Sequence, residues 1–295
     1  MSKDDESWGF ATGDQITPEL IAMKLLGGGS AYEAYLAFDE ITYAPVVVKV
    51  LRPTEVDDQH SLRGLRREVA TLAAVNHPVV VRGLRHDETG ERPHVVLENI
   101  DGPRLSTLIR RHGRLAEQQY LPLAIEIASA LHYFRHIDVC HLDIKPSNVI
   151  MSAPARLIDL SVARPAAEAA AISGSIGTDF YMAPEQCDTD RYDGPGHASD
   201  VWGLGATLFE AVAGYRPFDE GDRDAEDVVR RYPQLVDPPY EMPEGVPDEV
   251  AKVVYAALEP DPADRPQPHE IAGALEPVLA AQPPARLTFK VRGAR

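Results

Sequence analysis

The sequence predicts an α+β fold, with strands in the first hundred residues and helices in the remainder. Residues 46–50 form an apolar, valine-rich run that is typical of a buried strand. Residues 115–135 and 200–213 instead contain apolar runs suited to buried or half-buried helices. Because the predicted strands precede most of the helices, we expect the two kinds of element to occupy separate regions.

The composition excludes several classes of protein. The chain has 295 residues and a formal net charge of −17, the opposite of the basic balance expected of a nucleic-acid-binding protein. The apolar stretch 201–212 is interrupted by Glu210 and is too short to span a membrane. The N-terminus is polar and has no signal-peptide core. The two cysteines, Cys140 and Cys187, are not at a metal-binding spacing, and their number is typical of a reducing cytoplasm.

The N-terminal part begins with residues 1–15, which we expect to be a flexible leader. A first strand is predicted from about residue 17 to residue 26, followed by three consecutive glycines, Gly27, Gly28 and Gly29. Glycine has no Cβ, so its backbone can approach a phosphate closely, although a glycine cluster alone also fits a flexible turn. Here Lys49 follows on the predicted strand 46–50, which favours a phosphate site.

A helix is predicted over residues 61–75, where apolar residues recur near helical spacing and Glu68 lies among them. A glutamate on a helix is often only a surface residue, and that alternative stays open at this point. The helix should end at residues 76–78, since the position before a proline disfavours helical backbone. Strands are predicted at 79–81 and 94–97, separated by a polar turn at 87–90.

The most informative stretch combines Asp143, Lys145 and Asn148 with Asp159, eleven residues after the asparagine. Apolar runs at 149–151 and 157–158 predict two short strands joined by a turn. That hairpin would bring the two carboxylates and the amide together at its open end. Their oxygens are the hard ligands that Mg²⁺ prefers, and a carboxylate not needed by the metal could accept a hydroxyl proton. The pattern therefore indicates phosphoryl transfer.

The order His-x-Asp-x-Lys-Pro-x-Asn over residues 141–148 resembles the catalytic loop of eukaryotic-like protein kinases. The resemblance covers about residues 15–280. The lysine two positions after the aspartate resembles the serine/threonine branch of the family, and the whole chain resembles its bacterial-type members. It implies a two-lobed, protein-kinase-like fold. Residues 16–98 would form a small β-rich N-lobe with one main helix, and residues 99–280 a larger helical C-lobe. Residues 281–295 would be a basic tail, either disordered or folded back as a strand.

The resemblance also assigns roles. It implies an ATP site made by Gly27, Gly28, Gly29, Val47, Lys49, Leu97, Glu98, Ile100, Asn148 and Asp159. It implies the catalytic residues Asp143, Lys145, Lys49 and Glu68. Asn148 and Asp159 would hold Mg²⁺, or Mn²⁺ in its place, while Leu97 would gate the back pocket. The backbone of Glu98 and Ile100 would bond adenine.

In the C-lobe, residues 161–177 show no convincing periodicity and predict a mobile loop. The family pattern implies that Thr178 bonds near Asp143 and Lys145 and that Glu185 pairs with Arg265 in a structural ion pair. It also implies that Asp200, at the start of a buried helix, holds the backbone of the catalytic loop. Two further helices are predicted at 248–258 and 268–279.

The sequence departs from the family pattern at several positions. Tyr32 replaces a third glycine, Ala34 a valine, Val47 a small alanine, Leu142 an arginine, and Leu160-Ser161 the pair Phe-Gly. Two alternatives to a protein-phosphorylating enzyme therefore remain. One is a pseudokinase that acts as a nucleotide-binding scaffold or interaction module. The other is a small-molecule kinase of related fold, although residues 177–185 resemble a protein-docking segment. We expect protein substrates with serine or threonine acceptors, and the sequence leaves room for a dimer or a regulatory partner.

Overall fold

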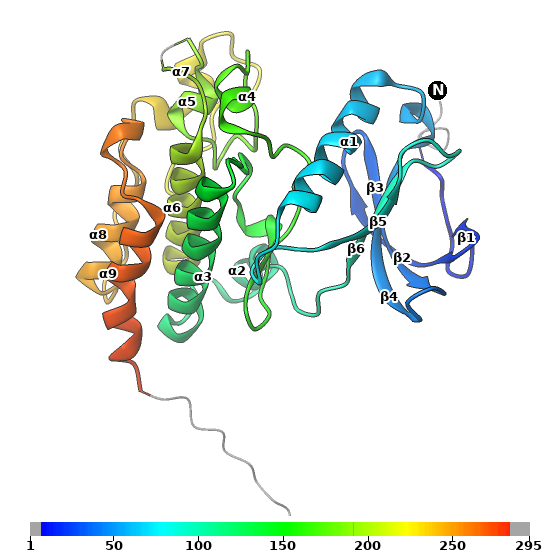
Figure 1. Ribbon diagram of the computed structural model, residues 1–295. Helices are drawn as coiled ribbons and strands as arrows, with labels where there is room; N and C mark the ends of the chain where they lie inside the picture. Colours follow the sequence, from blue (N-terminus) through cyan, green and yellow to red (C-terminus); the bar gives the residue numbers. More distant parts are fainter. Residues whose placement is uncertain (1–6, 191, 284–295) are drawn as a thin grey trace, which may run out of the picture.

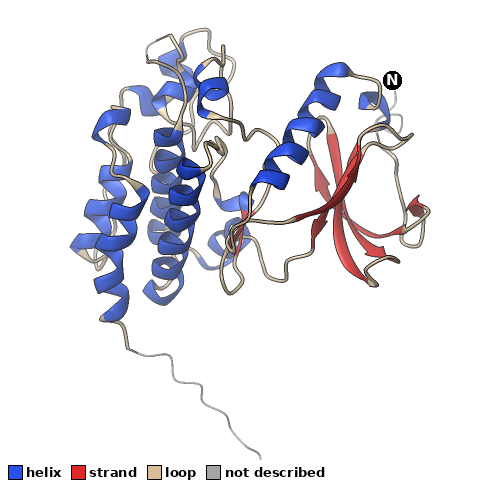
Figure 2. Cartoon of the chain, viewed as in Figure 1, coloured by secondary structure: helices blue, strands red, loops and turns tan. Residues whose placement is uncertain are grey.

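The computed structural model describes residues 7–190 and 192–283, and these form two lobes (Figure 1). The smaller lobe is a six-stranded antiparallel sheet with helix α1 (Gln59–Ala74) packed on one side. The larger lobe is mostly helical (Figure 2). The predicted α+β, two-lobed architecture is confirmed.

The sheet presents one face to the space between the lobes. Its strands are β1 (Gln15–Thr17), β2 (Leu20–Gly28), β3 (Tyr32–Asp39), β4 (Ala44–Leu51), β5 (Gly83–Asp87) and β6 (His94–Glu98). They lie in the order β1-β2-β3-β4-β6-β5. Helix α1 lies between β4 and β5 in the sequence, and β5 forms the edge of the sheet beyond β6. On β4 the two-residue period buries Val46, Val48 and Val50 in the core of the lobe. Val47 and Lys49 therefore lie on the other face.

The larger lobe is built around two long helices, α3 and α6, which lie side by side in Figure 1. Its helices are α2 (Leu105–His112), α3 (Glu117–His136), α4 (Ala166–Ala170), α5 (Pro184–Cys187), α6 (His197–Ala213), α7 (Val228–Arg231), α8 (Asp248–Ala257) and α9 (Pro268–Ala280). Single 3₁₀ turns occur at Pro53–Glu55, Pro146–Asn148, Pro233–Leu235 and Pro262–Asp264. Within 7–190 and 192–283, none of the helices has the length and apolar character needed to cross a bilayer.

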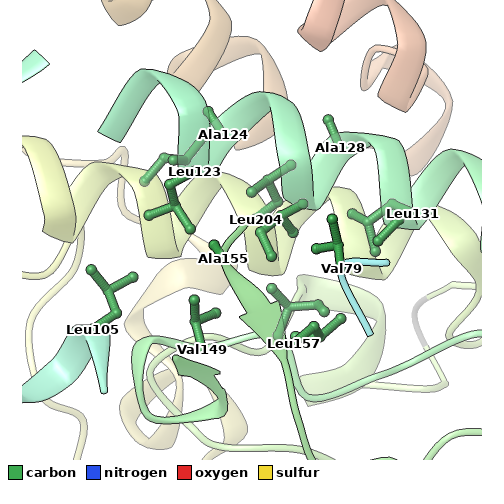
Figure 3. Close-up of a cluster of buried hydrophobic side chains, with 14 of the residues drawn as sticks. Val79, Leu105, Leu123, Ala124, Ala128, Leu131, Val149, Ala155, Leu157 and Leu204 are labelled. Atoms are coloured by element: carbon green, nitrogen blue, oxygen red, sulfur yellow. The ribbon is translucent and has the colours of Figure 1, made fainter. Parts of the chain in front are cut away.

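A short hairpin, β7 (Val149–Ile150) and β8 (Arg156–Leu157), lies against these helices. Figure 3 shows Val149 and Leu157 of the hairpin among apolar side chains of α3 and α6, with Leu105 of α2 nearby. Since both strands are anchored in this core, the loops that precede and follow the hairpin are fixed at its open end. The predicted pair of short strands is confirmed.

Helix α6 approaches the loop before the hairpin unusually closely. A Cβ added to Gly203 would lie 2.9 Å from the Cβ of Ile144 and 3.1 Å from its carbonyl oxygen. Only a residue without a side chain fits between the helix and this loop. The buried helix therefore serves as a rigid support for residues 141–148.

Several expectations about local structure are wrong. Residues 79–81 do not form a strand of the sheet; they pair instead with the C-lobe, since the Leu157 amide donates to the Val79 carbonyl at 2.6 Å. The loop 161–177 contains the short helix α4, and helix α2 was not predicted. The first long strand starts at Leu20, because Pro18 and Glu19 form a turn after β1.

The expected leader is also partly wrong. Trp8 and Phe10 pack on the outer core of the N-lobe, and the Trp8 Nε1–H donates to the Leu51 carbonyl at 2.7 Å. The guanidinium of Arg92 lies 5.0 Å and 4.9 Å from the two ring centroids. Burial of two aromatic rings explains why residues 7–14 are held on the sheet. The start of the leader, residues 1–6, and the basic tail from residue 284 onward lie outside the described residues.

The C-lobe contains a fully buried ion pair between Glu185 and Arg265. The two Arg265 guanidinium nitrogens donate to the two Glu185 carboxylate oxygens at 2.7 and 2.9 Å, and neither side chain is more than 1% exposed. Arg265 also donates to three backbone carbonyls, those of Ala198, Glu259 and Pro260. A pair so completely hydrogen-bonded can offset the cost of burying its charges, whereas either partner alone cannot.

We predict that Arg265→Ala lowers the free energy of unfolding by about 3–5 kcal/mol, because it leaves Glu185 buried and unpaired. Urea unfolding of the wild type and the variant measures the difference. The matched control is Arg230→Ala, which removes an ion pair with Asp222 whose side chains are 69% and 49% exposed. That control should cost less than about 1 kcal/mol. Equal losses in the two variants would contradict a structural role for the buried pair.

Candidate active site

The first part of the site joins β4 to α1. The buried face of α1 carries Leu62, Leu65 and Leu72, and Glu68 lies on the same face. This carboxylate accepts hydrogen bonds from the Lys49 ammonium at 2.6 and 2.9 Å. Its side chain is only 1% exposed, so the interpretation of Glu68 as a surface residue is wrong.

Lys49 reaches a second carboxylate across the gap between the lobes. Its Nζ lies 2.9 Å from Oδ1 of Asp159. Burial alone would lower the pKa of Lys49, but the Asp159 and Glu68 carboxylates outweigh it and raise that pKa, so the ammonium stays charged. Burial alone would raise the pKa of Asp159, whereas the Lys49 charge holds it below its ordinary value. The site therefore contains a fixed positive charge flanked by two carboxylates.

The catalytic loop is held by its backbone. Asp200, at the N-terminal end of α6, accepts the backbone N–H groups of His141 and Leu142, both at 2.7 Å. Leu142 has a φ of 64°, a left-handed conformation that is unfavourable for a residue with a side chain. The two hydrogen bonds fix the loop in this conformation. The predicted role of Asp200 is confirmed.

Asp143 is the centre of a network of short polar contacts. Its Oδ1 accepts the Thr178 hydroxyl at 2.8 Å, and its Oδ2 lies 2.7 Å from the Lys145 ammonium. Lys145 also donates to the Thr178 hydroxyl oxygen at 2.6 Å. The Asn148 amide donates to the carbonyl and to Oδ2 of Asp143, both at 3.0 Å. These contacts hold the Asp143 carboxylate in one orientation beside the Thr178 hydroxyl and the Lys145 ammonium.

Asn148 and Asp159 lie at the same mouth of the β7–β8 hairpin. The Ile158 amide donates to the Asn148 carbonyl at 2.8 Å, which places Asp159 next in the chain beside the asparagine. With its amide nitrogen directed at Asp143, the side chain of Asn148 has its oxygen left for a ligand. An amide oxygen and a carboxylate are donors suited to Mg²⁺, which usually takes few protein ligands and keeps waters or phosphate oxygens as the others. The donor set therefore fits the predicted metal.

A single cleft contains every residue that the resemblance placed in the nucleotide site. Its lining includes Gly27, Gly28, Gly29, Val47, Lys49, Leu97, Glu98, Ile100, Asn148 and Asp159. Lys145 lines the cleft as well, so the cleft adjoins the Asp143 network. A Cβ at Gly28 would lie 2.4 Å from the Tyr32 carbonyl oxygen, so the tight glycine loop requires glycine at this position.

One residue of the site was missed by the sequence reasoning. Gln186 is buried, and its Nε2 donates to the carbonyls of Leu142 and Ile176, at 2.9 and 2.8 Å. It thereby links the catalytic loop to the end of the 161–177 loop. A glutamine at the start of a short helix carries no distinctive signal, because the two carbonyls are 44 and 10 positions away in the chain.

Comparisons with known proteins agree with this arrangement. A family model described as "Protein kinase domain" matches residues 20–274. Serine/threonine-protein kinase PknB of Mycobacterium leprae is 32% identical, with 88% of this chain and 43% of that protein aligned. PknB of Mycobacterium tuberculosis is 30% identical, over 82% and 40% of the two chains. PknA of Corynebacterium glutamicum is 29% identical, over 96% and 61%. The chain thus spans less than half the length of the two PknB proteins.

We predict that Lys49→Met and Glu68→Gln each lower the rate of phosphoryl transfer from ATP, and that the double variant loses less than the sum of the two single losses. Two residues in direct contact share one interaction, which can be removed only once. Measuring the transfer rate for all four proteins completes the cycle. The matched control is the pair of Arg66, on the same helix, and Glu88, in the turn after β5. Their side chains lie 3.5 Å apart and are 49% and 27% exposed, so small and additive effects are expected. Full additivity at Lys49 and Glu68 would argue against a shared role.

Proposed function

The chain belongs to the protein kinase family, and we propose that it transfers the γ-phosphoryl group of ATP to serine or threonine hydroxyls of other proteins. The observation that carries this proposal is the contact between Asp143 and the Thr178 hydroxyl, with the Lys145 ammonium bonded to both. A base, a hydroxyl and a cation are thus already in hydrogen-bonding positions beside the cleft.

Each residue has a distinct part in the proposed mechanism. Asp143 orients the acceptor hydroxyl and takes its proton as the hydroxyl oxygen bonds to the γ-phosphorus, while the bond from that phosphorus to the β,γ-bridging oxygen breaks and ADP leaves. Lys49 and Lys145 neutralise charge on the phosphate oxygens. Asn148 and Asp159 would hold Mg²⁺, which supplies further charge neutralisation when bound. Positioning and electrostatics of this kind provide most of the acceleration in phosphoryl transfer.

The protein substrate is inferred from the segment that follows the 161–177 loop. Thr178 lies against Asp143, and the residues after it, through Pro184, are anchored by Gln186 and by the Glu185–Arg265 pair. A fixed segment beside the base gives an extended substrate peptide a surface on which to bind. The bacterial relatives are all serine/threonine-protein kinases by name, which supports the same acceptor class.

The alternative of an inactive interaction module is less well supported. Such a protein needs no assembled charge network, yet Lys49, Asp143 and Asp159 are all present and in contact with their expected neighbours. Detection of ATP-dependent phosphorylation of the chain itself or of a protein substrate, with Mg²⁺ or Mn²⁺, separates the two functions.

The two cysteines, both free and buried, support the proposal that the protein acts in the reducing cytoplasm.

In the proposed mechanism Asp143 is the base and Asp159 is a metal ligand. Asp143→Asn should lower the rate of phosphoryl transfer by about 10²- to 10⁴-fold, the usual contribution of a positioned base, while nucleotide binding is largely kept. Asp159→Asn should weaken Mg²⁺-dependent nucleotide binding as well, because it removes a proposed metal ligand. Single-turnover rates and titration with a fluorescent ATP analogue measure the two quantities. Transfer at nearly the wild-type rate in Asp143→Asn would refute the assignment.

The 161–177 loop is attached to the catalytic loop by apolar contacts. Leu142 is 2% exposed and packs in a cluster with Cys140 and with Ala169 of α4. In many kinases an arginine in place of Leu142 binds a phosphorylated loop residue through paired hydrogen bonds. Leucine has neither charge nor donors. Arg67 and Arg164 line the same cleft as Ser175 and are the cations that could substitute for it.

We therefore predict that activity depends only weakly on phosphorylation of this loop. Ser173→Ala/Ser175→Ala and phosphatase-treated wild type should both retain turnover on an exogenous substrate within about threefold of the untreated protein. Thr178 is left intact because it contacts Asp143 and Lys145. A loss beyond about tenfold, or about 1.4 kcal/mol of barrier, in either protein would show a phosphate-dependent switch. In that case Arg67→Ala and Arg164→Ala should produce the same loss.

A further inference from the structure

Tyr32 occupies a position where the family pattern has glycine, and its side chain projects toward the cleft. Along β3 the exposure alternates, so that Glu33 and Tyr35 are buried while Tyr32 and Ala34 lie on the face that lines the cleft. The side chain follows directly after the glycine loop, whose Gly29 amide donates to the Tyr32 carbonyl at 3.0 Å. A large aromatic ring thus lies immediately behind the phosphate-binding loop.

The ring touches two parts of the catalytic machinery. On one side the Lys49 ammonium lies 5.0 Å from the ring centroid, within the range of a cation–π contact. On the other side the hydroxyl reaches α1, where a Cβ added to Gly64 would lie 3.5 Å from it. A methyl group at position 64 would meet this hydroxyl at ordinary van der Waals distance, so the end of the tyrosine side chain lies against this turn of α1. Tyr32 therefore fills the gap between Lys49 and the helix that carries Glu68.

The hydroxyl itself contributes little to this contact. It is buried and has no hydrogen-bond partner among the described residues, although burial near Glu68 and Asp159 holds its pKa well above the ordinary value and keeps it neutral. A buried polar atom without a partner costs stability. The favourable part of the interaction must therefore come from the ring, through packing and through the charge of Lys49.

We propose that Tyr32 is a positioning residue, an aromatic wedge that holds Lys49 and α1 in the arrangement needed for phosphoryl transfer. This role rests on the proposed function for its catalytic consequence, but the wedge itself concerns only how α1 is held. Lys49 is thus contacted by the Tyr32 ring as well as by the Glu68 and Asp159 carboxylates.

The first experiment compares Tyr32→Ala with Tyr32→Phe. Removal of the ring should lower kcat by about tenfold or more while KM for ATP changes by less than about threefold, because adenine binds at the distant hinge end of the cleft. The phenylalanine variant keeps the ring and should retain turnover, with equal or greater stability because the unpaired hydroxyl is gone. Tyr43→Ala is the matched control, since that tyrosine is 82% exposed on the same lobe.

A second readout does not depend on catalysis. Hydrogen exchange of the amides of α1 should become about tenfold faster or more in Tyr32→Ala and stay close to wild type in Tyr32→Phe. If the wild type transfers no phosphoryl group, the proposed function fails while this measurement still tests the wedge. Unchanged α1 protection in Tyr32→Ala, or equal loss of activity in both variants, would overturn the proposal. Tighter ATP binding by Tyr32→Ala with unchanged hydrogen-exchange protection of α1 would also overturn it, since the ring would then only obstruct the nucleotide site.

The partner position gives an independent test. Gly64→Leu should drive a side chain into the Tyr32 hydroxyl, displace α1 and lower turnover on its own. In the double variant with Tyr32→Ala the leucine fills the vacated space. The loss of turnover should therefore be little greater than that of the more harmful single variant. Wild-type turnover in Gly64→Leu, or additive losses in the double variant, would show that the two residues do not act through one contact.

Discussion

The active site depends on one buried carboxylate, that of Asp200, which holds two backbone amides of the catalytic loop. The carboxylate is 2% exposed and its pKa is raised to about 7 by burial, against the opposing effect of the two N–H donors. Because those amides belong to His141 and Leu142, the hydrogen bonds set the loop immediately before Asp143. They also balance the strain of Leu142, whose left-handed backbone is unfavourable by about 1–2 kcal/mol. The direction of the Asp143 side chain follows from this anchor.

The second half of the site is fixed from the opposite lobe. Lys49 crosses from β4 to Asp159, which lies just beyond the β7–β8 hairpin, and Glu68 on α1 holds the same ammonium. Two carboxylates around one buried lysine make its charge permanent, because losing the proton would leave both acids without a partner. The two lobes are therefore linked by an electrostatic contact through Lys49.

Local sequence patterns placed Glu68 on a helix and Asp143, Asn148 and Asp159 around one hairpin. The pairing of Glu68 with Lys49 came from the family resemblance, because the two residues belong to separate segments. The contacts that were missed join distant segments. Trp8 bonds to the carbonyl of Leu51, 43 residues away, and no local pattern signals that partner.

The wrong expectations have similar causes. The three valines at 79–81 are as apolar as a buried strand, but their extended backbone pairs with Leu157 of the other lobe rather than with the sheet. Helix α2 has only eight residues, which is too short for its apolar spacing to stand out beside the preceding turn residues. Short segments of this kind are determined by their tertiary neighbours, which the sequence does not identify.

Two of the positions where the chain departs from the family pattern, Leu142 and Tyr32, share a physical character. At Leu142 an apolar cluster with Cys140 and Ala169 takes the place of an arginine that would bind phosphate. At Tyr32 an aromatic ring fills the space beside Lys49 and α1 that a glycine would leave open. In both places packing does what elsewhere requires a charge or another support. Apolar packing is neither screened by salt nor removed by a phosphatase, whereas the contact between the Tyr32 ring and the Lys49 ammonium is in part electrostatic.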